Sequence, residues 1–213
     1  MSQDSEYIHN LAAVLLVLGT TTFIGSLFIL FLRADFQAIV SGQLQRALGA
    51  VAEHVTLFRW SYVGATGGVV LSTLGLVTLT TLLLKAGDSV LSVLALILFL
   101  LAALLWIVEH SIHLSMTVWA AGETSRTSLV PDSYEPMYQL AETVERIYTV
   151  LAFTSVAIYG WALLKTGLLP SWVGWVSIGW SGLGLIVFLT NLNSIPALLL
   201  IMPFVMGIVL LVR

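Results

Sequence analysis

Residues 89–121 read SVLSVLALILFLLAALLWIVEHSIHLSMTVWAA, and this stretch decides the class of fold. Its apolar first part, about twenty residues, has the length that crosses a bilayer as a helix. That run leads directly into Glu109, His110 and His113. Ionisable side chains are costly in a membrane span and usually have a function there. The stretch therefore predicts a membrane protein and also the location of its functional site.

The composition of the whole chain agrees with this prediction. Of its 213 residues, 59% are hydrophobic and 9% are charged, and the mean hydropathy is +1.03. Soluble domains carry roughly 25% charged residues, so a water-soluble fold is excluded. The absence of cysteine excludes disulfides, thiolate metal sites and cysteine nucleophiles. The net charge of −3 does not indicate nucleic acid as a partner.

Apolar runs elsewhere in the chain predict further spans. We expect an all-α, polytopic membrane helix bundle of six transmembrane helices, with one amphipathic interfacial helix between the first and the second. In this prediction residues 1–213 form a single transmembrane domain. The expected spans are about 11–32, 62–84, 89–118, 137–165, 171–190 and 194–212.

The segment 34–58, between the first two spans, has the pattern of an amphipathic helix. Its apolar residues recur every three or four positions, which is the period of one helix face. They are Phe36, Val40, Leu44, Leu48, Val51, Val55 and Phe58. The pattern predicts a helix that lies in the membrane interface or covers the end of the bundle. A solvated connector helix without a function fits the same pattern.

Two further patterns predict how the spans are arranged. Gly64 and Gly68 are four residues apart in the second span, which favours the close approach of a neighbouring helix. Trp172, Trp175 and Trp180 lie in the first half of the fifth span. Tryptophans near the end of a span usually mark the membrane interface.

Several local patterns in the chain are shared with a known family. They are Trp106 with Glu109 and His113, Val130-Pro131 with Tyr134-Glu135-Pro136, Gly167-Leu168-Leu169-Pro170 followed by Trp172-Val173-Gly174-Trp175, and Pro196 with Pro203 and Gly207. The chain resembles, in these patterns, a broad bacterial family of six-helix membrane proteins of unknown function. The resemblance supports the helix count and implies no activity. We expect the protein in the bacterial cytoplasmic membrane.

Six spans distribute the ionisable residues unevenly between the two faces of the membrane. The connector 34–58, the loop predicted at 122–136 and the turn near Asn191 must share one face. Three of the four histidines and eight of the eleven acidic residues belong to that face: His54, His110, His113, Asp35, Glu53, Glu109, Glu123, Asp132, Glu135, Glu142 and Glu145. The other face keeps Asp4, Glu6, Asp88 and His9.

Helix geometry brings part of this set together. Glu109, His110 and His113 project from roughly one side of the third span, because residues three and four apart are neighbours on a helix. Glu142 and Glu145 have the same relation on the fourth span, its expected antiparallel partner. Carboxylates and imidazoles that face each other across two helices resemble the metal sites of helix bundles. The predicted metal ligands are these five residues, with Glu53 and His54 as further candidates, and they suit zinc, iron, copper or manganese alike.

Haem is an alternative cofactor. His110 or His113 would supply one axial ligand, and His54 or Met116 the other. Two interpretations without any ligand stay open beside it. Glu142 has the spacing to pair with Arg146 on the same helix, and the Glu/His group can form a hydrogen-bonded cluster at the interface.

The sequence thus supports three hypotheses of function. The first is an integral membrane protein whose Glu/His site at one membrane face binds a metal ion or haem. The second is a non-catalytic scaffold or accessory subunit, in contact with other membrane subunits or with a second copy of itself. The third is a small transporter or proton path. The chain has no nucleophile motif, phosphate-binding glycine loop or HExxH pattern, so no enzyme class is assigned.

Overall fold

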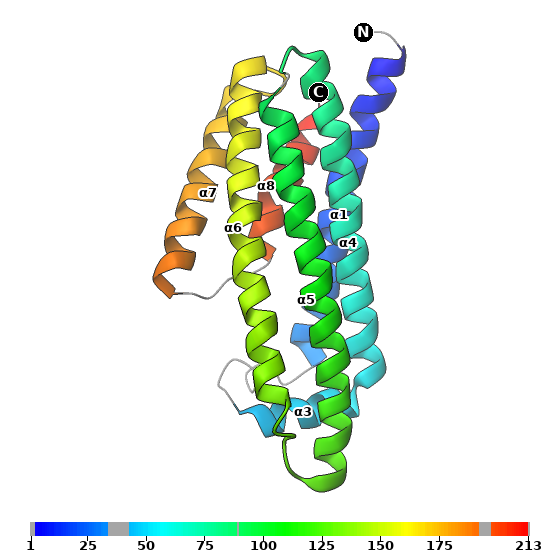
Figure 1. The fold of residues 1–213 in the computed structure, drawn as a ribbon. Helices are drawn as coiled ribbons and strands as arrows, with labels where there is room; N and C mark the ends of the chain where they lie inside the picture. The colour runs from blue at the N-terminus through cyan, green and yellow to red at the C-terminus, as the bar shows by residue number, and fades with distance from the viewer. Residues whose placement is uncertain (1–2, 34–42, 89, 192–196, 213) are drawn as a thin grey trace.

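The computed structural model describes residues 3–33, 43–88, 90–191 and 197–212, and these residues form helices without any strand. The predicted all-α bundle is thereby confirmed. Most helices run alongside one another, whereas α3 lies across one end of the bundle (Figure 1). The bounds are α1 (Gln3–Arg33), α3 (Leu44–Glu53), α4 (Val55–Lys85), α5 (Leu91–Thr127), α6 (Tyr134–Thr166), α7 (Ser171–Asn191) and α8 (Ala197–Leu211).

Five of these helices are long and apolar enough to cross a membrane, namely α1, α4, α5, α6 and α7. They correspond to the first five predicted spans. The sixth predicted span, 194–212, is represented by α8, an apolar helix of 15 residues. A helix of that length is about 22 Å long, shorter than the hydrocarbon core of about 30 Å. The described part of the chain therefore contains five candidate spans and one shorter apolar helix.

The third and fourth spans extend further than predicted. α5 ends at Thr127 and not near residue 118, and the predicted loop 122–136 shrinks to 128–133. The residue that follows the helix, Ser128, has a left-handed φ of 59° and caps its C-terminus. Glu123 and Arg126 form an ion pair at 2.6 Å on the last turns, a spacing that supports helix. The polar residues after 121 thus continue α5 and do not mark its end.

The predicted amphipathic connector is confirmed in its central part. Residues 34–42 lie outside the described residues, and α3 covers 44–53. Gln45 Nε2 donates a hydrogen bond of 2.9 Å to the carbonyl oxygen of Ser128, which fixes α3 to the end of α5. The last apolar positions of the predicted connector belong to α4, which begins at Val55. The buried side of α3 consists of Ala47, Leu48 and Val51.

The glycines of α4 allow a very close approach of α1. A Cβ on Gly68 would lie 2.6 Å from the backbone nitrogen of Phe23, and one on Gly75 would lie 2.8 Å from the side chain of Leu16. Contacts below 3 Å are not tolerated, so only glycine fits at these positions. The neighbour predicted from the spacing of Gly64 and Gly68 is therefore α1 of the same chain.

The tryptophans near the α6–α7 turn mark one surface of the membrane layer. Trp172 and Trp175 are 50% and 62% exposed, and Trp161 at the facing end of α6 is exposed as well. Aromatic side chains with this placement form interfacial belts. Trp180 departs from the prediction, since its indole N–H donates a hydrogen bond of 2.9 Å to the carbonyl oxygen of Leu198 in α8.

The exposed side of α5 marks the other surface of the membrane layer. Its exposed side chains as far as Val108 are large and apolar: Val93, Leu94, Ile97, Leu100, Leu101, Leu104 and Val108. From Ser111 onward they are mostly small or polar: Ser111, Ser115, Trp119, Gly122, Ser125 and Arg126. The boundary therefore falls between Val108 and Ser111. Helix α7, whose 21 residues span about 31 Å, matches the thickness of one bilayer core.

Buried apolar side chains form two clusters, one on each side of this boundary. The larger cluster lies within the membrane layer and includes Trp106 and Tyr148. The smaller cluster holds α3 against α4, α5 and α6 and consists of Leu48, Val51, Phe58, Ala120, Ala121 and Tyr134. We call the membrane surface next to α3 the α3 face. The opposite surface, where α4 turns into α5, is called the Asp88 face.

Candidate functional site

Glu109, His110 and His113 lie on α5 at the boundary of the α3 face, between the two apolar clusters. Glu109 is 4% exposed, and the side chains of His110 and His113 are 11% and 16% exposed. A charged or polar group buried this deeply is costly unless hydrogen bonds satisfy it. We call these three residues the Glu109 cluster.

The carboxyl group of Glu109 bridges the two imidazoles. Its Oε2 lies 2.8 Å from Nδ1 of His110, and its Oε1 lies 3.3 Å from Nε2 of His113. Each carboxyl oxygen thus serves a different histidine. The second nitrogen of His110, Nε2, is buried and has no hydrogen-bond partner among the described residues. The cluster therefore contains three titratable groups in direct contact and one unused ring nitrogen.

Aromatic side chains from three helices enclose the cluster. The imidazole of His110 packs against Trp106, with ring centroids 3.5 Å apart, and against Tyr62 of α4 at 4.7 Å. His113 meets Tyr138 of α6 edge-on, at 5.2 Å. These rings cover the sides of the cluster.

A second carboxyl group lies near the same tyrosines. Glu145 of α6 interacts electrostatically with Tyr62, Tyr138 and Tyr148. Glu109 interacts with Tyr62 and Tyr148 as well. Two acidic side chains from neighbouring helices therefore face a shared set of tyrosines, as the expected pairing of the third and fourth spans required.

The remaining predicted ligands lie elsewhere. Glu142 is partly exposed and lies 3.7 Å from Arg146, the pairing considered from the sequence. His54 is exposed between α3 and α4, eight residues before Tyr62 and therefore about two helical turns from the cluster. Met116 packs against the smaller apolar cluster. The structure brings together Glu109, His110 and His113 and does not add these residues to them.

The geometry of the cluster differs from that of a metal site. No group of three or more His, Asp or Glu side chains within the described ranges is arranged to hold a metal ion. The reason is visible at Glu109, whose carboxyl group occupies the space between the imidazoles. A metal would require the donor atoms of all three residues to converge on a common point. Here they converge on one another.

The aromatic residues around the cluster were not among the sequence-predicted site residues. Trp106 precedes His110 by four positions, and Tyr138 and Tyr148 lie on the predicted partner helix. The four-residue spacing between Trp106 and His110 could have predicted their contact, because residues four apart are neighbours on a helix. Tyr62 had none, because its place beside His110 depends on the packing of α4 against α5.

A second buried acid lies at the Asp88 face. Asp88 is 1% exposed, and its Oδ2 accepts a hydrogen bond of 2.6 Å from the backbone N–H of Ser92 at the start of α5. Lys165 at the end of α6 lies 3.7 Å from its other oxygen. Burial by itself raises the pKa of Asp88, but these hydrogen bonds and the Lys165 charge outweigh it and lower the pKa from 3.8.

Comparisons with protein-family models, curated proteins and solved structures find no match to this chain. The resemblance to a bacterial membrane-protein family therefore stays a prediction. The structure supports a membrane protein with several long apolar helices and a buried Glu/His cluster at one membrane face.

Proposed function

We propose that the Glu109 cluster is a proton-binding site and that this membrane protein takes up and releases a proton at its α3 face. The observation that carries the proposal is the bridging position of Glu109, with one carboxyl oxygen directed at each imidazole. Histidine changes its charge near neutral pH in its ordinary state, and carboxyl groups in direct contact with it titrate together with it. A buried trio of this kind holds protons in numbers that depend on the pH outside.

His113 is the natural entry point for that proton. It is the most exposed member of the cluster. From α6, Tyr138 meets its ring, and the acidic groups that interact with Tyr138 are Glu142 and Glu145. A proton taken up by the His113 ring makes it an imidazolium, and the Nε2–H bond breaks as an O–H bond forms at Glu109 Oε1. Rotation of the protonated carboxyl group then directs that O–H at His110 Nδ1, where the O–H bond breaks and an N–H bond forms. Each transfer breaks one N–H or O–H bond and forms another, so no further reactant is needed.

The metal and haem hypotheses from the sequence gain no support from this geometry. They keep a direct test, which is the visible absorbance spectrum and elemental analysis of the detergent-purified protein. A Soret band or stoichiometric metal would replace the proton-binding proposal by a cofactor site. A role as scaffold or accessory subunit likewise stays a hypothesis, tested by co-purification in mild detergent.

The proposal is tested by infrared difference spectroscopy of the purified protein. Protonated carboxyl groups absorb separately from carboxylates, so a titration over about pH 4 to 7, where carboxyl and imidazole groups ordinarily ionise, detects proton uptake. We expect a pH-dependent carboxyl band that is lost in Glu109→Gln. Glu123→Gln is the matched control, since Glu123 lies on the same helix and pairs with Arg126 outside the membrane layer. A band that survives in Glu109→Gln would overturn the proposal.

A further inference from the structure

Buried polar side chains continue from the Glu109 cluster toward the Asp88 face. They lie on α4, on α6 and in the turn between α4 and α5. Tyr159 and Ser155 are 0% exposed, Thr80 is 4% exposed and Asp88 is 1% exposed. Polar side chains inside a membrane bundle are expensive unless they serve packing or a pathway. Their succession along one line of the bundle is the observation to be explained.

Of these buried polar residues, those nearer the Asp88 face include two hydroxyl groups in contact. The hydroxyls of Tyr159 and Thr80 lie 2.7 Å apart, and either of them can be the donor. The carbonyl oxygen of Leu76 lies 2.8 Å from Thr80 Oγ1 and 3.4 Å from the Tyr159 hydroxyl, so the hydroxyl that accepts within the pair can donate to Leu76. A pair that can reverse its direction is what a proton relay requires, because each group accepts one proton as it gives up another. Beyond the pair, Ser92 is buried directly beside Asp88, whose carboxyl group accepts a hydrogen bond from the Ser92 backbone N–H.

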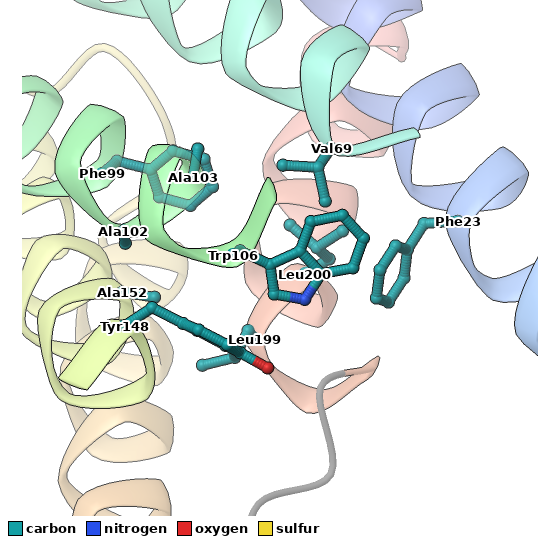
Figure 2. A pocket seen from close by; sticks show the side chains of 10 residues that line it. All are labelled: Phe23, Val69, Phe99, Ala102, Ala103, Trp106, Tyr148, Ala152, Leu199 and Leu200. Atoms are coloured by element: carbon teal, nitrogen blue, oxygen red, sulfur yellow. The ribbon is translucent and has the colours of Figure 1, made fainter. Parts of the chain in front are cut away.

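The half of this line near the Glu109 cluster contains a small cavity. Its volume is about 30 Å³, and ten side chains from α1, α4, α5, α6 and α8 line it, as Figure 2 shows. Most of them are apolar, and the polar atoms come from Trp106 and Tyr148. One water needs about 10–15 Å³ and two or more polar partners, so the cavity has room for one or two waters.

The cavity lies between the two halves. At one end Trp106 packs against His110 of the Glu109 cluster. At the other end are Phe99 and Ala152, each about one helical turn from the hydrogen bond of 2.6 Å that Ser155 Oγ donates to the carbonyl oxygen of Ala95. Small side chains leave this space open, namely Ala102, Ala103 and Ala152.

We propose that these groups form a water-assisted proton route across the membrane layer, from Glu109 through the cavity, Ser155 and the Tyr159–Thr80 pair to Asp88. The proposal rests on proton binding by the Glu109 cluster. It adds that the proton crosses the membrane layer and is released at the Asp88 face, so the protein has a function in proton transport. The balance is simple, since one proton enters at the α3 face and one leaves at the Asp88 face. Each hydroxyl or water in between forms one O–H bond and breaks another.

The experiment uses the full chain in sealed liposomes with a pH-sensitive dye inside and a potassium diffusion potential. We expect a potential-driven proton influx above that of protein-free liposomes. Tyr159→Phe keeps the ring and removes the hydroxyl, and we expect it to lower the influx on the order of a hundredfold, the smallest effect typical of a positioned proton-transfer group. Ala152→Val, which fills the cavity without touching a hydroxyl, is expected to act in the same direction.

Thr154→Val is the matched control, because Thr154 is on α6 as well and bonds only to the carbonyl oxygen of Val150. It should conduct like the unchanged protein. Thermal unfolding of each variant shows whether the fold is kept. If the infrared band of Glu109 titrates but the liposomes show no influx, or if both Tyr159→Phe and Ala152→Val conduct normally, the route is overturned while the proton-binding site stands. If the band itself is missing, the proposed function fails first.

Discussion

The indole ring of Trp106 packs against the imidazole of His110, with ring centroids 3.5 Å apart and planes inclined by 32°. Trp106 is 3% exposed and belongs to the large apolar cluster in the membrane layer. His110 belongs to the Glu109 cluster. One turn of α5 therefore connects the large apolar cluster to the Glu109 cluster. A substitution of Trp106 should alter the packing of the His110 ring.

Replacing Trp106 by Phe tests this link. The smaller ring leaves part of the space at His110 empty and removes the indole N–H near Tyr148. We expect a loss of about 1–3 kcal/mol of unfolding free energy, between the cost of a small and a large core truncation. Thermal unfolding in detergent measures it, together with the pH titration of the carboxyl band.

Trp119→Phe provides the comparison for Trp106→Phe. Trp119 lies on the same helix and is 42% exposed beyond the membrane boundary. Its replacement should leave both the unfolding temperature and the carboxyl band unchanged. Equal effects of the two substitutions would show that the contact of Trp106 with His110 contributes nothing specific to stability or to the titration of the carboxyl band.

The second prediction concerns the effect on stability of replacing two adjacent glycines of α4. A Cβ on Gly68 meets the backbone of α1 at 2.6 Å, whereas one on Gly67 meets nothing within 4 Å. Gly68→Ala should therefore lower the unfolding free energy by about 1–3 kcal/mol through overpacking. Gly67→Ala should be neutral or stabilising by up to about 1 kcal/mol, because alanine favours helix. The measurement is thermal unfolding of both variants under one condition.

The sequence predicted the class of fold because hydrophobicity over about twenty residues follows directly from bilayer thickness. It predicted the Glu109 cluster because positions three and four apart share a helix face. It did not predict that Glu109 stands between the histidines, since this depends on side-chain conformations. It also missed Tyr62, whose contact with His110 arises only when α4 packs on α5. The spacing of residues along the sequence determines which side chains share one face of a helix. The packing of several helices determines which side chains of other helices they contact.

Asp88 predicts a stability that depends on pH. Its hydrogen bond from Ser92 and the Lys165 charge hold its pKa in the folded protein below 3.8. A group with a lowered pKa stabilises the fold above its unfolded pKa, and this contribution disappears as the pH falls through the lower, folded value. Asp88→Asn should therefore cost about 1 kcal/mol near neutral pH, as for the loss of a helix cap. The difference should shrink below about pH 4, the ordinary range of an aspartate pKa.

Unfolding temperatures of the unchanged protein and of Asp88→Asn, recorded across this pH range, check the prediction. Asp132→Asn is the control, because Asp132 is exposed in the turn between α5 and α6. A constant difference between the Asp88 variant and the unchanged protein down to the lowest pH would show that the charge of Asp88 contributes nothing.

The membrane boundary on α5 is tested by single-cysteine labelling, which the absence of native cysteines makes direct. Leu100 and Leu104 are exposed toward lipid on our assignment, and Ser115 and Ser125 on the same helix are exposed toward water. In intact liposomes or cells, a membrane-impermeant maleimide should react with Ser115→Cys and Ser125→Cys when they face the reagent. It should not react with Leu100→Cys or Leu104→Cys, because a thiol in hydrocarbon is not ionised and not reached.

Denatured protein serves as the reference for full labelling at all four positions. Labelling of Leu104→Cys as fast as Ser115→Cys would move the boundary toward the Asp88 face and place the Glu109 cluster in water. Protection of Ser115→Cys on both sides of the membrane would place the cluster deeper in the bilayer. With the boundary between Val108 and Ser111, reactivity should change within the two turns that carry the Glu109 cluster. The site would then have one end in the apolar core and the other within reach of the aqueous phase.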